Sequence, residues 1–396
     1  MLGNRHYQDS FRAIQNSSKN HKSSLDLAIS AVSNIFLSFL SRRPELEELG
    51  EEQFAVAVSL TRAALDDPTK ITSDSTLISI LLLSNFRSVM AYRSPVIMHY
   101  IGLAQILRAR GPDYCNTEIS QLCLQQVSGR LVDAVLGGSF IETNQLLEAS
   151  RLLPKPVPDI EESPIVLLSS FVPHINQLRL KMESVSLGMG FDAEIVADIL
   201  SFALETESEL SKWPEMVNPT CQPMLSASLL SEFQSKCPHH PAETYYPQWA
   251  DEYPSLIISQ IWNSYRCLRI MVNTCISRCA ALTRNYSLAT STEQICQEMV
   301  DNFCASVPFH IGSLSSRHAS HPGNVQGNTS PSKLAALGAM LLMPKLRWIV
   351  GQHLTLRGGQ MEWLQLQLSD VLQFYRMHGV RMSDDVATRA SPILAQ

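Results

Sequence analysis

The residues best suited to binding a metal ion are thiols and imidazoles that lie close together in the sequence. The densest group is Cys237-Pro238-His239-His240, in a stretch rich in proline. A structural zinc site needs four ligands in tetrahedral geometry, and the sequence has no second ligand pair at the usual spacing. We therefore expect a loop at residues 237–240, without a metal ion or another cofactor.

Five further cysteines follow at helical spacing in the C-terminal half. Free cysteine is among the most frequently buried residue types. We therefore expect these cysteines to be small core residues at places where helices approach one another. These cysteines are Cys267, Cys275, Cys279, Cys296 and Cys304. The total of nine is odd, and the cysteines are spread over helical segments, which argues against a disulfide framework.

The remaining candidates for acid–base chemistry are histidines. His310, His318 and His321 lie in a stretch rich in Ser, Gly, His and Asn, where we expect solvated side chains. His99 lies one turn into a helix, and we expect it to be packed and hydrogen-bonded rather than a catalytic base. Nucleophile elbows, phosphate-binding glycine loops and dinucleotide motifs are missing from the sequence. The sequence therefore predicts no catalytic, cofactor-binding or metal-binding residue, and no enzyme.

A group of Met and aromatic residues leaves two interpretations open. The side chains could line a cavity for an apolar effector, but core packing explains them without a ligand, and we favour packing. The residues are Trp262, Tyr265, Met340, Met343 and Trp348.

Charge and hydropathy set limits on partners. The formal net charge is −6, and the longest run of basic residues is the Arg42-Arg43 pair. We expect no direct binding of nucleic acid, because such binding needs clustered Lys and Arg. The first residues lack the apolar core of a signal peptide, and the longest clean apolar run, Leu334–Met343, is halted by Pro344. We therefore expect an intracellular protein without a membrane span.

Residues 72–112 predict two consecutive helices around which the chain is organised. Ser73 and Asp74 are suited to cap the first helix, and the apolar residues of Leu77–Leu83 surround it, which is typical of a helix buried on most sides. The second helix ends at Gly111-Pro112, with Arg110 in its last turn, where the helix dipole favours cations.

Apolar periodicity predicts helices along most of the chain, and the fold class is all-α, a large multi-helix domain with antiparallel packing and long loops. The other expected helices are 25–40 (followed by Pro44), 49–65, 115–136, 165–187, 191–210 (with Glu205, Glu207 and Glu209 at a solvated end), 225–233, 255–282, 292–306, 333–354 and 362–378. The expected organisation is a flexible leader (1–22), an N-terminal helical half (23–150), a Pro-rich linker (151–164) and a C-terminal helical half (165–396) with loops 213–247 and 310–331.

Several of these motifs occur in an order that is typical of a known family. An apolar helix opened by Ser-Asp precedes His-x-x-Gly and Leu-x-x-Arg-Gly-Pro, and a Trp-Asn-x-Tyr-Arg helix follows Tyr-Pro-Ser-Leu. The chain thereby resembles the regulatory domain of fungal zinc-cluster transcription factors, from about Leu25 to Arg381. The residues that carry the resemblance are Ser73-Asp74, His99, Gly102, Leu107, Arg110-Gly111-Pro112, Tyr253–Leu256, Ile261–Ile270 with Trp262, Asn263, Tyr265 and Arg266, Met340–Trp348 and Trp363–Arg381.

The resemblance implies a transcriptional regulator that acts in the nucleus through a protein partner, either a zinc-cluster factor or another copy of the chain. It also implies a small-molecule effector as a further kind of partner, and nutrient or secondary-metabolite genes as targets. The zinc cluster itself is missing: the first cysteine is Cys115, and no Cys-x-x-Cys occurs. Two alternatives stay open, a ligand-binding or enzymatic protein of a metabolic pathway, and a truncated gene model.

Overall fold

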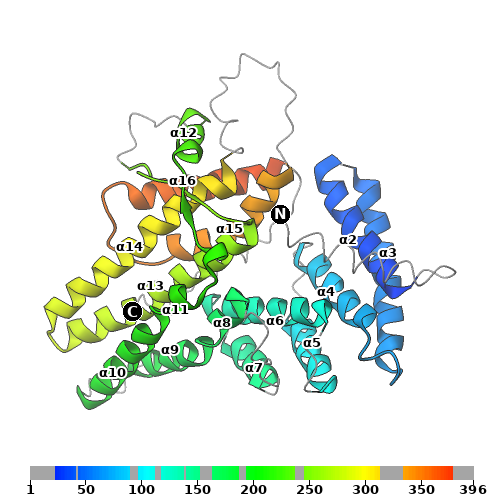
Figure 1. Cartoon of the computed structure of the whole chain (residues 1–396), viewed down its shortest axis with the longest axis horizontal. Helices are drawn as coiled ribbons and strands as arrows, with labels where there is room; N and C mark the ends of the chain where they lie inside the picture. The colour runs from blue at the N-terminus through cyan, green and yellow to red at the C-terminus, as the bar shows by residue number, and fades with distance from the viewer. Residues whose placement is uncertain are drawn as a thin grey trace. The chain divides into compact units, whose positions relative to one another are not determined.

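The computed structural model describes residues 23–41, 43–89, 97–111, 117–137, 140–151, 163–186, 193–236, 245–312 and 333–377. Helices make up almost all of its regular structure, which confirms the all-α fold class (Figure 1). The chain divides into two compact units: residues 1–134, 139–166 and 375–386 form the first, and residues 135–138, 167–374 and 387–396 form the second.

The first unit is built on an antiparallel helical hairpin onto which a third helix packs. Its helices are α2 (Ser24–Ser41), α3 (Pro44–Leu65), α4 (Asp74–Val89), α5 (Ile97–Ala109), α6 (Glu118–Leu136, up to residue 134) and α7 (Phe140–Arg151). Helix α4 packs against α2 and α3, and the rings of Phe54 and Phe86 stack between them with centroids 4.4 Å apart. Buried residues Leu77, Ile78 and Leu81 lie on several sides of α4, which confirms that it is central to this unit.

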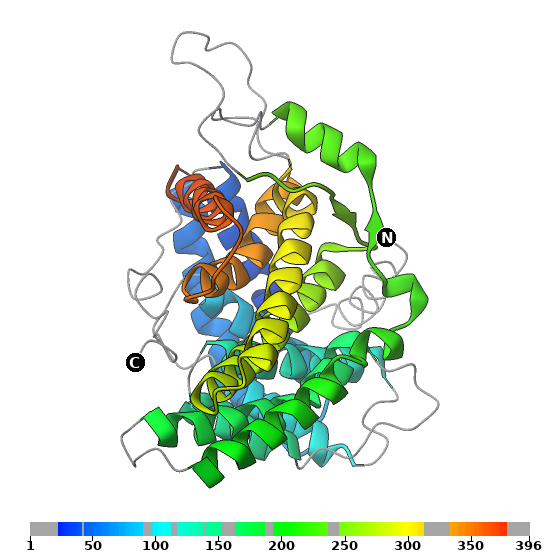
Figure 2. The same ribbon diagram turned by 90° about the vertical axis from the view of Figure 1, so that its left-hand side faces the viewer.

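The second unit is built on two long antiparallel helices, α13 (Leu256–Leu282) and α14 (Tyr286–Ile311), which Figure 2 shows running side by side. Helices α10 and α15 pack against α13, α15 also packs against α14, and α9 packs against α10. The remaining elements are α8 (Pro164–Ser169, from residue 167), α9 (Val172–Ser186), α10 (Ala193–Leu210), α11 (Trp213–Met216), η2 (Pro219–Cys221), β1 (Met224–Leu225), α12 (Ala227–Lys236), β2 (Asp251–Glu252), α15 (Lys333–Val350) and α16 (Gln360–Met377, up to residue 374).

At three places a proline has a different effect on the helix boundaries from the one expected. Pro44 begins α3 instead of closing the preceding helix, since a first helical position needs no N–H donor. The single helix expected over 165–187 is two helices, α8 and α9. Pro173, in the first turn of α9, cannot donate the hydrogen bond that would continue α8. Helix α14 continues beyond 306 and contains Pro308.

Two short strands were not expected from the sequence. Strands β1 and β2 pair antiparallel, with Met224 opposite Glu252 and Leu225 opposite Asp251. Each is two residues long, too short for a period-two pattern to be visible. The ladder fixes Asp251 beside helix α14, onto which β2 packs.

Candidate functional site

The Ser-Asp pair that opens α4 has the capping role expected of its first member. The hydroxyl of Ser73 accepts a hydrogen bond from the backbone N–H of Thr76 at 3.2 Å, and the Thr76 hydroxyl donates to the carbonyl of Lys70. The prediction of Ser73 as a cap is confirmed. Asp74, the first residue of the helix, is engaged elsewhere.

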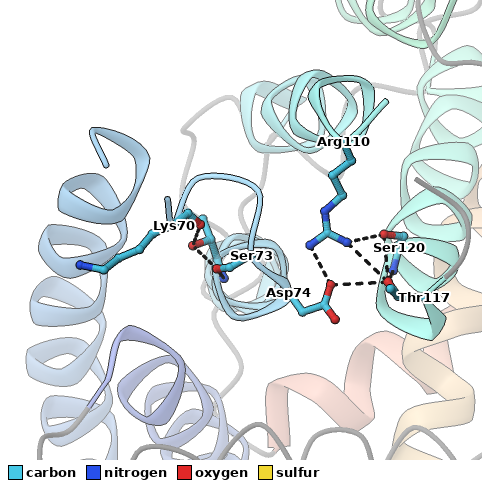
Figure 3. A network of polar contacts seen from close by, with 7 residues as sticks. Lys70, Ser73, Asp74, Arg110, Thr117 and Ser120 are labelled. Carbon is cyan, nitrogen blue, oxygen red and sulfur yellow. Dashed lines mark hydrogen bonds and ion pairs between the residues drawn. The ribbon is translucent and has the colours of Figure 1, made fainter. Parts of the chain in front are cut away.

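Arg110 joins the starts of α4 and α6 to the end of α5 (Figure 3). Its guanidinium pairs with the Asp74 carboxylate at 2.7 Å and donates to the hydroxyl of Ser120 at 2.5 Å. The hydroxyl of Thr117 accepts from the backbone N–H of Ser120 and so caps α6. Asp74 and Arg110, which belong to the motifs that carry the resemblance, therefore link these helices, and the Arg110 side chain is only 11% exposed.

Removal of Asp74 is expected to loosen this junction. In the variant Asp74→Ala, Arg110 keeps its buried position but loses its only ion-pair partner among the described residues, which costs about 2 kcal/mol. We expect amide hydrogen exchange of α4, α5 and the start of α6 to accelerate about tenfold or more. The control Lys70→Ala removes a side chain that is 65% exposed and is expected to change nothing measurable. Equal amide exchange rates in both variants would show that the ion pair between Asp74 and Arg110 does not stabilise these helices.

Three aromatic rings pack together at the Trp-Asn-x-Tyr-Arg segment of α13 in the second unit. Trp213 of α11 stacks on Tyr265 of α13 at 4.8 Å and meets Trp262 edge to face at 5.0 Å. The indole N–H of Trp262 donates to the carbonyl of Cys221. All three rings are buried against each other, so core packing accounts for Trp262 and Tyr265. A small-molecule effector stays a prediction.

The polar residues of the same helix form a buried network. Arg266 donates to the side chain of Asn263 at 2.7 Å and pairs with Asp251 at 3.3 Å. Asn263 also exchanges hydrogen bonds with Ser306 of α14, and the hydroxyl of Tyr253 donates to Asp251. Burial raises the pKa of Asp251, although the charge of Arg266 acts in the opposite direction. The network holds β2, α13 and α14 together.

Glu207 was expected at a solvated helix end, and that expectation is wrong. It is buried, and its carboxylate pairs with the guanidinium of Arg269, which also donates to the hydroxyl of Tyr265. The ion pair ties α10 to α13 beside the ring of Tyr265. Glu205 and Glu209, on the same helix, are exposed as expected.

A second polar cluster in this unit was not anticipated. The buried side chain of Gln360, at the start of α16, donates to Asp301 of α14 at 2.9 Å and accepts from Gln297 at 2.7 Å. Arg357 reaches Asp301 from the preceding loop at 2.8 Å. Gly359, with φ +77°, turns the chain into α16 immediately before Gln360. This glycine was the one local sign of a constrained turn here.

The five cysteines of α13 and α14 are buried and free, as expected for core residues. Burial raises the pKa of the Cys275, Cys296 and Cys304 thiols to about 12, so they stay protonated at neutral pH and are poor nucleophiles and metal ligands. Within the described ranges, no group of three or more His, Cys, Asp and Glu residues lies close enough to hold a metal ion. Residues 237–240 lie outside the described residues, as do His318 and His321.

His310 was expected in a solvated loop, and this expectation is also wrong. It lies in the last turn of α14, fully enclosed, and its Nδ1 bonds to the carbonyl of Gly338 in α15 at 3.1 Å. Because a carbonyl only accepts, Nδ1 carries the proton, and Nε2 has no hydrogen-bond partner among the residues that the structure describes. Burial lowers the pKa of His310 to about 4, and the charges of Arg266 and Lys345 act in the same direction.

The lowered pKa predicts a loss of stability in acid. The unfolded chain takes up a proton on this imidazole near pH 6.5 but the folded chain only near pH 4, so stability falls between these values as the pH is lowered. From pH 7 to pH 5 the loss from this group is about 2 kcal/mol. His310→Asn keeps a donor for Gly338 but has no titrating group. In denaturant titrations of both proteins, identical pH dependence would contradict the assignment.

The remaining residues singled out from the sequence are His99 in α5 and three residues of α15. His99 is half-buried in α5 and has an interaction partner, in line with a packed histidine. Met340, Met343 and Trp348 are half-buried on α15. The structure therefore gathers Trp262, Tyr265 and Arg266 in one region of the second unit and Asp74 and Arg110 in the first unit. The contacts described above join these residues to one another and to neighbouring helices.

Comparison with known protein families, curated proteins and solved structures finds no match to this chain. Within the described part of the chain, no helix combines the length and the hydrophobicity needed to cross a membrane.

Proposed function

We propose that this chain is a transcriptional regulator that works through a protein partner, in the manner that its resemblance to the regulatory domain of fungal zinc-cluster factors implies. The observation that supports the proposal is the role of the resembling residues. Asp74 and Arg110 link helices of the first unit, and Trp262, Asn263 and Arg266 link elements of the second. In this proposal, the scaffold that these residues hold together presents a surface to another protein.

The proposed mechanism is delivery to DNA by the partner. A factor with its own DNA-binding domain binds a promoter in the nucleus, and this chain joins it and changes its output. The formal net charge of −6 agrees with this division of tasks, since the chain's overall charge opposes association with a polyanion. Nutrient or secondary-metabolite genes are the targets that the resemblance implies, and an effector that binds the scaffold would adjust the response.

Immunoprecipitation of the tagged full chain from its native cells tests the proposal. We expect recovery, in near-stoichiometric amount, of a protein that carries a DNA-binding domain. Recovery of the chain with a tightly bound metabolite and without such a protein would contradict the proposal and favour a ligand-binding or enzymatic role. The variant Glu209→Ala, which changes one exposed side chain in α10, serves as a control that should recover the same factor.

A further inference from the structure

Helix α3 carries a second apolar stripe besides the one it buries. Gly50, Ala57 and Thr61 are buried on one side of the helix. Leu49, Val56 and Leu60 recur at spacings of seven and four residues, so they share one face, about a quarter-turn around from the buried side. These three side chains are exposed, Val56 by 50%. Among the described residues of its unit, α3 therefore presents an apolar face that no other element covers.

Helix α2 provides the other wall of this surface. Asn34 of α2 donates to Gln53 of α3 at 2.9 Å, which fixes the register along the seam between the two antiparallel helices. One turn beyond this bond on each helix lie the exposed residues Leu37 and Leu49. We call the surface formed by Leu37, Leu49, Val56 and Leu60 the hairpin face.

The outer rim of the hairpin face is acidic. Glu45, Glu48 and Glu52 are exposed and lie on the side of the stripe away from α2, in the N-terminal half of α3. Glu45 also suits the helix dipole in the first turn, whereas Glu48 and Glu52 follow after that turn. Among the described residues, the ion pair found on this rim joins Arg43 to Glu45 at 3.7 Å and offsets one of the three charges.

We propose that the hairpin face binds an amphipathic helix of the partner protein, with Lys or Arg residues along one border of its apolar stripe. The proposal rests on the proposed function in that it names how the partner is held. Two antiparallel helices leave a shallow apolar seam that a third helix fills, as in helical bundles. The glutamates on one rim select a basic border on that helix and fix its direction.

Site-specific crosslinking in native cells tests the contact itself. A photocrosslinking residue is introduced as Val56→p-benzoylphenylalanine in the full chain, with Met98→p-benzoylphenylalanine as a control at an exposed site of α5 in the same unit. We expect a partner to be captured at least tenfold more from position 56. Its crosslinked peptide should map to a helix with Lys or Arg beside an apolar stripe.

Crosslinks from position 56 that map to this chain would overturn the proposal, because a second copy or another part of the chain would then cover the face. Capture no greater than at position 98, or mapping to a segment without basic residues, would overturn it too. Glu45→Gln, Glu48→Gln and Glu52→Gln combined are expected to lower the capture several-fold while the helical circular dichroism of the whole chain stays unchanged. If immunoprecipitation recovers a DNA-binding factor but these crosslinks fail, the proposed function stands and only the proposal that the hairpin face binds the partner is contradicted.

Discussion

Replacement of Gly338 by alanine is expected to destabilise the second unit by about 3 kcal/mol or more. A Cβ atom at this position would lie 2.1 Å from the carbonyl oxygen of His310 and 2.9 Å from its carbonyl carbon. Both atoms belong to the backbone of α14, so no side-chain rotation relieves the clash. The helices α14 and α15 would have to move apart, which also breaks the bond from the His310 imidazole to the Gly338 carbonyl.

Tryptophan fluorescence measures this effect specifically, because all five tryptophans lie in the second unit, at positions 213, 249, 262, 348 and 363. The denaturation midpoint of Gly338→Ala should shift strongly downward. Gly358→Ala is the matched control in the same unit, since a Cβ there meets no atom of the described residues within 4 Å. A Gly338→Ala midpoint equal to that of the control would contradict the close approach of the two helices.

The second large effect is expected for Asp251→Ala, at about 3–5 kcal/mol. The side chains of Asp251 and Arg266 are only 8% and 4% exposed, so removal of the carboxylate leaves a buried guanidinium without its counter-charge. Tyr253 loses its acceptor at the same time. Asn263 keeps its bond to Arg266, but an amide oxygen does not neutralise the charge.

An exposed ion pair in the same unit gives the comparison. Glu209 and Lys212 are 3.7 Å apart and largely exposed, so Glu209→Ala is expected to change the unfolding free energy by less than about 0.5 kcal/mol. Denaturant titrations followed by tryptophan fluorescence measure both variants. If the Asp251 variant also loses less than about 1 kcal/mol, the buried network does not hold β2 to α13 and α14.

The expectations from sequence are right where short-range chemistry decides the structure. Ser73 caps α4 because its hydroxyl and the N–H of Thr76 are three residues apart. Helix α13 has the expected extent because Ser255 caps its start and apolar residues continue to Leu282. The buried cysteines follow from the same periodicity. In each case the deciding residues lie within a few positions of each other.

The failures concern contacts between distant parts of the chain. Glu207 looks solvated beside Glu205 and Glu209, and only Arg269, 62 residues later, explains its burial. His310 begins a polar stretch, but Gly338 of α15 encloses it from 28 residues away. The composition of the sequence around Glu207 and His310 does not reveal partners that are distant in the sequence. The hairpin face was missed for the related reason that exposed and buried apolar stripes look alike in the sequence of α3.

Chromatin immunoprecipitation of the tagged full chain, in cells with and without the gene of the recovered DNA-binding factor, tests the central claim most directly. Delivery by the partner predicts enrichment at discrete promoters that disappears when the partner gene is deleted. Enrichment that persists without the partner would show that this chain reaches DNA by itself. Enrichment at no promoter, in cells where the factor is bound, would show that the chain does not act on transcription there.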